Sequence, residues 1–486
     1  MRLPGLLALL LVACRHVPPR AECASHQGTA WRELQTEHFL LSTNLDAEAA
    51  RASVLELERN RKVLLDVFGQ RVRPPGQVEV VVLQSHEQLT EFAQDSVSAY
   101  FSLTGDGPLL VFGAESYASE AAPARRVVLH ELAHHISRYE LLRQPRWFAE
   151  GLAGYLETLR PYGEKGDLAM GEVDSRKLAF LLRRPPLPLQ VLWAWDDAGD
   201  LSAEALQHRY ASAWLWTHFL LNRHAERFSR FQAGLARAVE PRAAWAEAFH
   251  GVTEATLESD LAEYARHGAY GMRSFKAEET QVTHRERMLS DAEVHVLRSR
   301  LFLRSPPRVG AGPLASARRE LDAAEQRDAS SFAVKAARYE TLEQAPEQLA
   351  SARALTVAHP EEGGAWRRLN EQLVNAGGPP AEIKAAAVKA LQWSASDPRA
   401  LNNLAWVYLS DGKAPTAIPL VTKAVKLAPW NAAYLDTLAS ALARVGRCSD
   451  AVAVERRALD VMAERGTPAF IDGVKARISG YEKGCQ

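Results

Sequence analysis

The sequence of 486 residues predicts an α+β domain followed by an all-α solenoid of helical repeats. In the first half, short apolar and partly β-branched segments alternate with an amphipathic helical pattern. From Ser290 onward these strand signals disappear, and Ala-rich helical patterns replace them. The length by itself calls for two or three domains. We therefore expect one domain over residues 31–280 and a repeat domain over residues 281–486.

The first domain is expected to begin with strand, helix and strand. His38–Asn44 and Val78–Ser85 have the apolar, β-branched character of strands. Between them, a helical pattern starts after Asp46, which is a good N-cap residue. A third strand is expected at Gly107–Gly113, between two glycines, and Pro123 then opens another helix.

The helix that Pro123 opens carries the spacing His-Glu-x-x-His at His130, Glu131 and His134. Residues four apart lie on one face of a helix, so both imidazoles can bind one metal ion. Glu131 lies about 100° around the helix from His130 and can face the edge of the same site. Zinc sites of this kind need a third protein ligand and leave the fourth position to water. The following segment offers Glu150, a carboxylate on an otherwise apolar helix face that needs a partner when buried.

The segments HELAHH and PRWFAEGLAGYLE together resemble the gluzincin metallopeptidases, the thermolysin-like superfamily, and especially its bacterial peptidase-MA-like branch. The resemblance covers roughly Trp31 to Gly271 and is concentrated in these two segments. It implies a zincin-type fold, the Zn²⁺ ligands His130, His134 and Glu150, and Glu131 as general base in peptide-bond hydrolysis. It also implies that the strand PLLVFG is the edge strand above the site, along which a substrate peptide lies extended.

The chain departs from the thermolysin-like pattern in two respects. Fifteen residues separate His134 from Glu150, fewer than in thermolysin itself, and position 154 is Gly where such sequences often carry an Asp that supports a ligand. Glu157 is therefore an alternative, either as a ligand or as the carboxylate that supports one.

A peptidase also needs a hydrogen-bond donor for the oxyanion of the tetrahedral intermediate. Tyr210, at the start of an apolar helix, resembles the donor position of related families, although a tyrosine in the core is an equally good interpretation. His208 and Tyr155 are weaker candidates. His135 faces about 100° away from His134 and is expected to be a packing or surface residue.

The second half repeats itself with a period of thirty-four residues. Six small or apolar positions recur at this offset: Leu401, Leu404, Ala405, Gly412, Ala417 and Ala424 return as Leu435, Leu438, Ala439, Gly446, Ala451 and Ala458. This pattern resembles the tetratricopeptide repeat, and more degenerate helix pairs precede it from residue 289 onward. The resemblance implies a solenoid that binds a substrate or a protein partner on its concave face.

The chain begins with MRLPGLLALLLVAC, an apolar run that is too short to span a membrane and is typical of an export signal. Leu11–Cys14 resembles the bacterial lipobox. This implies a signal peptide over residues 1–13, a lipidated Cys14 that anchors the protein to a membrane, and a tether over residues 14–30. Arg15, rather than Asp, favours the outer membrane, facing the periplasm. A plain cleaved signal peptide is the alternative.

The balance of charges bears on the class of partner, and the cysteines bear on disulfide formation. The 58 basic and 59 acidic residues nearly cancel, and without a long basic run nucleic acid is not an expected partner. In an oxidising envelope Cys448 and Cys485 could form a disulfide, which would leave Cys23 as a thiol.

Together these features predict an envelope zinc metallopeptidase, a hydrolase of a protein or peptide substrate, whose repeats recruit the substrate or a partner. The alternative is an envelope adaptor or assembly factor in which the repeats bind partners and the zincin domain is not catalytic.

Overall fold

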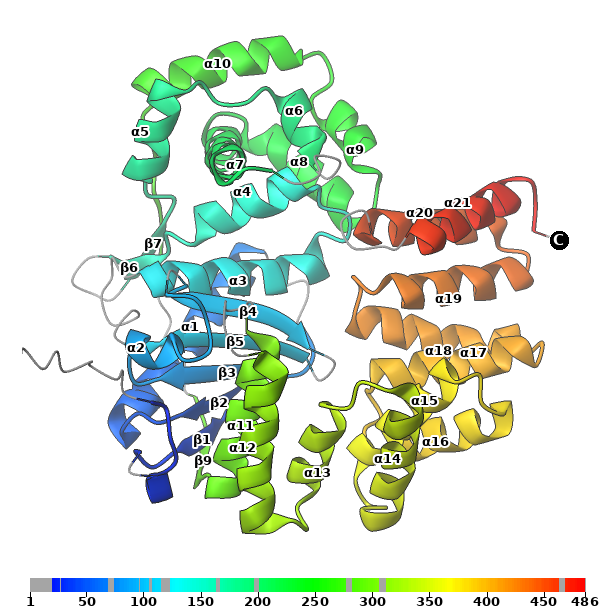
Figure 1. The fold of residues 1–486 in the computed structure, drawn as a ribbon. Coiled ribbons are helices and arrows are strands. Elements are labelled where there is room, and N and C mark those ends of the chain that lie inside the picture. Colours follow the sequence, from blue (N-terminus) through cyan, green and yellow to red (C-terminus); the bar gives the residue numbers. More distant parts are fainter. Residues whose placement is uncertain are drawn as a thin grey trace, which may run out of the picture.

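The computed structural model describes residues 20–26, 28–68, 74–95, 97–104, 107–114, 123–162, 167–195, 201–276, 282–305, 312–462 and 468–485. An α+β part with a central sheet is followed by helical repeats that curve along one side of it (Figure 1). The expected signal peptide and Cys14 lie outside the described residues. Within the described ranges, no helix is both long and apolar enough to cross a membrane.

Six of the described strands form a mixed sheet in the order β4-β5-β3-β2-β1-β9, and three others form a separate small sheet. The bounds of the six strands are β1 (Arg32–Gln35), β2 (Phe39–Thr43), β3 (Val78–Leu83), β4 (Ala99–Thr104), β5 (Gly107–Gly113) and β9 (Arg285–Met288). The three strands expected from the sequence are β2, β3 and β5, which run parallel to one another at the centre. The expected edge position of β5 is wrong, because β4 pairs with β5 antiparallel and takes that edge. The two strands lie only two residues apart in sequence, so antiparallel pairing is the short connection available to them.

Both faces of the sheet are covered. On one face, α1 (Ala47–Val67) and α3 (Pro123–Glu140) pack against β-strand side chains such as Val80 and Val82. On the other face, Val81 and Val111 pack against α11 (Asp291–Arg304), the first helix of the repeat region. Burial on both sides explains why β3 is a continuous apolar run rather than an alternating one. The sheet includes β9, and α11 packs on one of its faces, so both elements join the N-terminal part although they follow residue 280, where the sequence places the domain boundary.

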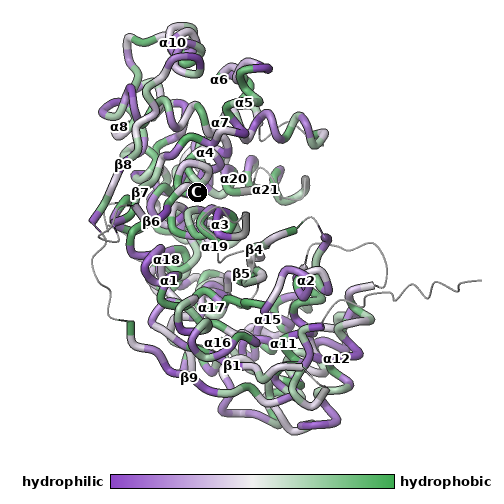
Figure 2. Tube along the Cα trace, turned by 90° about the vertical axis from the view of Figure 1, so that its left-hand side faces the viewer, coloured by the Kyte–Doolittle hydropathy of each residue, from purple (hydrophilic) through white to green (hydrophobic). Residues whose placement is uncertain are grey.

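The remainder of the N-terminal part is mainly helical and lies above the sheet in Figure 1. Its helices are α4 (Arg146–Leu156), α5 (Ser175–Arg183), α6 (Leu189–Trp193), α7 (Ala203–Arg223), α8 (Ala225–Ala236), α9 (Pro241–Ala248) and α10 (Glu254–His267), and its strands, which form the small sheet, are β6 (Arg160–Tyr162), β7 (Asp167–Met170) and β8 (Arg273–Phe275). The short helix α2 (His86–Leu89) lies beside β3 and β5 instead. Helix α4 lies directly against α7, where a Cβ at Gly151 would fall 2.3 Å from Ala213 O. Glycine is therefore required for this approach, and α4 and α7 lie next to each other in Figure 2. Both helices contribute buried apolar side chains to the main core.

The C-terminal half consists of the helix pairs that the sequence predicts. They are α11 with α12 (Pro313–Asp328), α13 (Phe332–Tyr339) with α14 (Ala345–Ala358), α15 (Gly363–Asn375) with α16 (Pro380–Trp393), α17 (Pro398–Ser410) with α18 (Ala414–Leu427), and α19 (Ala432–Arg444) with α20 (Cys448–Met462), followed by α21 (Pro468–Glu482). Gly412 and Gly446 have φ of 74° and 80°, a left-handed conformation that favours glycine in the turn. Ala405 and Ala439, one period apart, are fully buried where helices touch. Helical repeats thus form this half of the chain.

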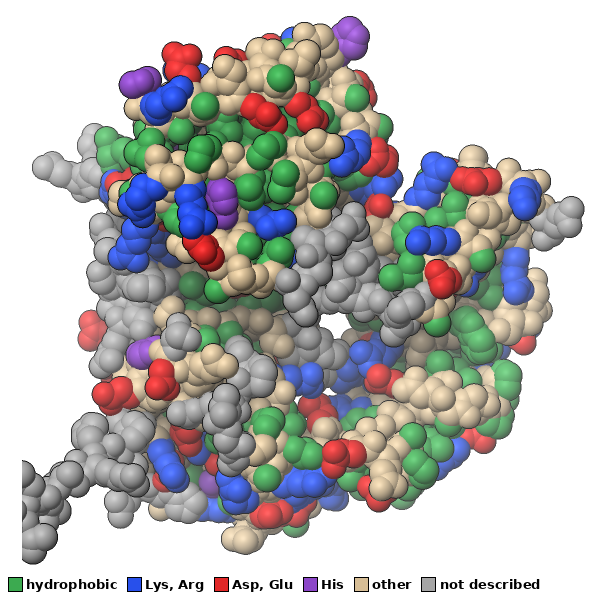
Figure 3. Space-filling model, turned by 45° about the horizontal axis from the view of Figure 1, so that its top comes forward, with side chains coloured by type: hydrophobic (Ala, Val, Ile, Leu, Met, Phe, Trp, Pro, Cys, Tyr) green, Lys and Arg blue, Asp and Glu red, His purple; other side chains and the backbone are tan. Residues whose placement is uncertain are grey.

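The two ends of the described chain are both held. Near the N-terminus, Ala21 and Cys23 are fully buried, and the Arg298 guanidinium of α11 donates to Ala21 O at 2.7 Å. Near the C-terminus, Cys448 and Cys485 form a disulfide that joins the start of α20 to the chain end. The last repeats contact the N-terminal part again, through the pair of Arg143 with Asp460 of α20. Figure 3 shows an opening between the N-terminal part and the repeats.

Candidate metal centre

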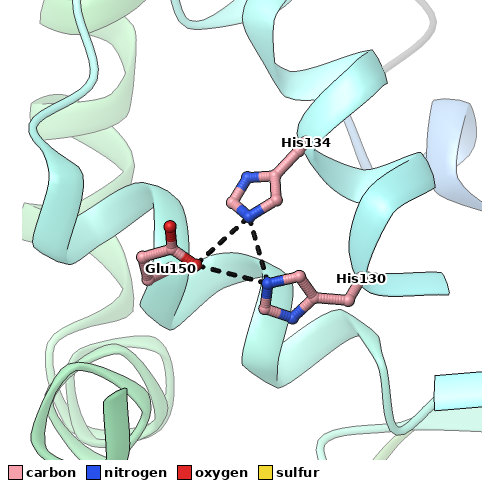
Figure 4. A group of neighbouring side chains, drawn as sticks. All are labelled: His130, His134 and Glu150. Carbon is pink, nitrogen blue, oxygen red and sulfur yellow. Dashed lines mark hydrogen bonds and ion pairs between the residues drawn. The ribbon is translucent and has the colours of Figure 1, made fainter. Parts of the chain in front are cut away.

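Two neighbouring helices bring together three side chains that the sequence singles out as metal ligands. His130 and His134 point from α3, and Glu150 points toward them from α4 (Figure 4). The two histidine Nε2 atoms lie 3.1 Å apart, and Glu150 Oε2 lies 3.3 Å from His130 Nε2 and 3.2 Å from His134 Nε2. The three atoms form a nearly equilateral triangle, and the group could hold a metal ion.

The charges of this triangle favour an ionised carboxylate. Burial by itself would raise the pKa of Glu150, but hydrogen bonds from His130 and His134 outweigh burial and hold that pKa well below its usual range. Burial would lower the pKa of His130, whereas hydrogen bonds to Glu150 and Glu157 raise it to about 10. A metal ion at this position would displace the proton from His130 Nε2, so metal binding should release protons.

Glu157 is placed behind His130 rather than in the triangle. Its Oε2 lies 2.9 Å from His130 Nδ1, the ring nitrogen that faces away from Glu150. Burial would raise the pKa of Glu157, but the hydrogen bond from His130 and the charges of Lys177 and Arg126 lower it to about 2. Of the two roles left open by the sequence, the geometry gives Glu157 that of a carboxylate supporting a histidine.

A network of charges extends behind Glu157, and the sequence analysis did not identify it. Arg126 donates to Glu157 Oε1 at 2.8 Å and to Asp174 Oδ2 at 2.6 Å. Lys177 Nζ also donates to Glu157 Oε1 at 2.8 Å. Asp174 in turn caps α5 by accepting from the Lys177 backbone N–H at 3.0 Å. Arg126 could have been found, since it precedes His130 by one helical turn and so lies on the same face.

A cavity of about 760 Å³ opens beside the triangle. Its lining includes His130, Glu131 and Tyr210, together with apolar side chains such as Val127 and Phe180. The candidate base and the candidate oxyanion donor thus face the same space. Burial, followed by the negative charge of Glu150, raises the pKa of Tyr210 to about 12, so its phenol is protonated at neutral pH.

The other polar candidates lie elsewhere. His208 Nε2 is 2.9 Å from Pro185 O, and Tyr155 is fully buried with its ring 5.4 Å from that of His218. Neither is among the described residues that line the cavity. His135 is buried, 5% exposed, and packs edge-on against Tyr139, so of the two expected roles, packing or surface, it has the packing role.

Comparison with known proteins identifies no family for this chain. No protein-family model matches the chain, and no curated protein matches it. Among solved structures, a thermophilic TPR protein of Thermus thermophilus is similar at 16% sequence identity and a TM-score of 0.27, over 35% of this chain and 92% of that chain.

Proposed function

We propose that this protein is a zinc-dependent peptidase of the bacterial cell envelope, with His130, His134 and Glu150 as zinc ligands and Glu131 as general base. The observation that carries the proposal is the triangle of ligand atoms, with sides of 3.1 to 3.3 Å. Two atoms that each lie about 2.1 Å from a tetrahedral zinc ion are about 3.4 Å apart. Two imidazoles, one carboxylate and an open fourth side therefore fit a catalytic zinc site.

The residues around the triangle supply the rest of a peptidase. A zinc ion held there would act as a Lewis acid on the substrate carbonyl and lower the pKa of water. Glu131, next to His130 and facing the same cavity, takes the proton of the attacking water and returns it to the leaving amine. Tyr210 donates a hydrogen bond to the oxyanion, which its protonated phenol supports. The substrate lies extended along the edge strand β4.

The remaining parts of the proposal concern location and recruitment. Cys14 carries a lipid that anchors the protein to a membrane, as the lipobox-like sequence suggests. The helical repeats bind the protein substrate or a protein partner.

The second candidate is an adaptor whose repeats bind partners and whose metal centre only stabilises the fold. The contact of the repeats with α3 favours it, because Tyr139 on that helix reaches Leu427 O in the repeat region. A metal without a reaction would then serve to hold α3 and α4 together.

The two functions are separated by measuring bound zinc and the cleavage of an unfolded protein substrate. For the peptidase, wild type and Glu131→Gln each bind one zinc ion, and only wild type cleaves. Glu204→Gln, which changes an exposed carboxylate on α7 paired with Arg184, is the control and retains cleavage. Zinc without cleavage by wild type favours the adaptor, and a protein without zinc overturns the site.

A further inference from the structure

The glycine at position 154 leaves room for Lys177. A Cβ at Gly154 would lie 3.4 Å from Lys177 Nζ and 3.7 Å from Trp214 Cβ. The ammonium group therefore occupies the space into which a longer side chain at position 154 would extend. Lys177 comes from α5, whose first turn is fixed because Asp174 accepts from the backbone N–H groups of Arg176 and Lys177, each at 3.0 Å.

From this position Lys177 holds one oxygen of Glu157 while His130 holds the other. Lys177 Nζ is 2.8 Å from Glu157 Oε1, and His130 Nδ1 is 2.9 Å from Glu157 Oε2. Arg126 reinforces the first contact at 2.8 Å. Because two cations bind Oε1, the orientation of the carboxylate is fixed and Oε2 is directed at the imidazole.

The imidazole can donate to Glu157 only from Nδ1. In the neutral imidazole that binds a metal, a proton on Nδ1 leaves the lone pair on Nε2, and Nε2 is the atom that faces His134 and Glu150. A carboxylate in this place fixes both the tautomer and the rotation of a metal-binding histidine. The Glu157 side chain is 11% exposed, so water competes little for the contact.

We propose that Glu157, oriented by Lys177 in the space left by Gly154, is the positioning residue that holds His130 ready for the metal. This inference rests on the proposed function, because it assumes that His130 is a ligand. Glu157 itself lies outside the triangle of ligand atoms, behind His130. Lys177 acts on His130 only through Glu157. Its effect on zinc affinity depends on the length of its side chain as well as on its charge.

The test is the zinc affinity of the full chain, measured by competition with a chromogenic chelator. Glu157→Gln is expected to lower the affinity about 10- to 100-fold, the usual cost of losing such a support. Glu157→Asp retains the charge but is too short to reach His130, so a loss of the same size is expected. Lys177→Met is expected to lose several-fold, and Lys177→Arg, which can still bind Oε1, remains within about twofold of wild type.

Two comparisons decide the outcome. Equal zinc affinity of wild type and Glu157→Gln overturns the positioning role, even if wild type binds zinc and cleaves its substrate. If Glu157→Gln fails to fold, the Lys177 pair decides, because equal affinities of Lys177→Met and Lys177→Arg overturn the proposal. A wild type that binds no zinc removes the proposed function as well, so the two failures are distinguishable. Glu204→Gln serves again as the unaffected control.

Discussion

Tyr139 and Trp430 meet edge to face with ring centroids 4.9 Å apart, and they join the helix of His130 and His134 to the repeat region. The Tyr139 hydroxyl donates to Leu427 O at 3.1 Å. Trp430 lies in the link between α18 and α19, so the contact spans almost three hundred residues of sequence. The position of the repeats and the geometry of α3 are therefore physically connected.

Removing the indole should loosen the end of α3. Trp430→Ala is expected to lower the free energy of unfolding by about 0.5–1.5 kcal/mol for the aromatic pair alone. Backbone amides of residues 136–141 should then exchange faster with solvent deuterium. Trp406→Ala is the matched control, because Trp406 is 49% exposed on α17. Equal exchange of residues 136–141 in the two variants would show that the contact does not support the helix.

A charged pair reinforces the same junction. Arg143, whose side chain is 8% exposed, pairs with Asp460 of α20. Asp460→Asn leaves the guanidinium without its counter-charge and should destabilise the protein. The cost should be smaller than the about 3–5 kcal/mol of a fully buried pair, since the Asp460 side chain is 36% exposed. Adding Arg143→Met to this variant should recover part of the loss in chemical denaturation. A double variant that is simply the sum of the two single changes would exclude a coupled pair.

Tyr210 can be tested by removing one oxygen atom. Tyr210→Phe deletes the proposed donor to the oxyanion and should lower kcat by about 100- to 1000-fold while bound zinc is unchanged. Tyr162→Phe removes a hydroxyl from a tyrosine that is 45% exposed on β6 and should have no effect. Should Tyr210→Phe cleave at the wild-type rate, the tyrosine is a packing residue beside Trp195, whose ring centroid is 5.2 Å away.

Glu455 should give the repeats an unusual dependence of stability on pH. Its carboxyl is fully buried, and burial together with the negative charge of Asp436 raises its pKa to about 8, despite Arg477 at 2.8 Å. The folded state then binds a proton that the unfolded state, with a pKa of 4.5, releases. This contribution to stability is greatest below pH 4.5 and is lost as the pH rises toward 8, at about 1.4 kcal/mol per unit of pKa difference.

Thermal unfolding between pH 5 and pH 8.5 measures this effect. Glu455→Gln keeps the shape without the ionisation, so its unfolding midpoint should fall less than that of wild type as the pH rises. Glu482→Gln, which alters a carboxylate that is 45% exposed on α21, should retain the wild-type dependence. Identical pH profiles of wild type and Glu455→Gln would mean that Glu455 is ionised in the folded protein.

The features that the sequence predicts correctly follow from patterns of residues close together in the chain. Asp46 caps α1 by accepting from Ala49 N–H at 2.8 Å, as its position before a helical pattern indicates. Helical spacing was sufficient to place His130 and His134 on one face, and the thirty-four-residue period was sufficient for the helix pairs. Each of these features depends on residues that are close in sequence, so one segment of the chain is enough to predict it.

Features that depend on distant segments were not predictable in the same way. Strands β1 and β9, with the sequences RELQ and RERM, are short and polar and carry no alternation of apolar residues. They are strands because β1 pairs with β2 and β9 pairs with β1. Lys177 likewise gained its place beside Glu157 from the packing of α5, twenty residues further along the chain. No local pattern contains that information.

The pairing of β1 with β9 also determines the order in which the protein can fold. Arg32 and Glu286, which join the two strands at 2.6 Å, are separated by 254 residues. As the chain is synthesised, the sheet is left with one unpaired edge and one bare apolar face until β9 and α11 follow. Contacts this far apart form slowly, and the waiting surface is open to aggregation. The helix with both histidines is thus made well before the strand that completes the sheet beneath it.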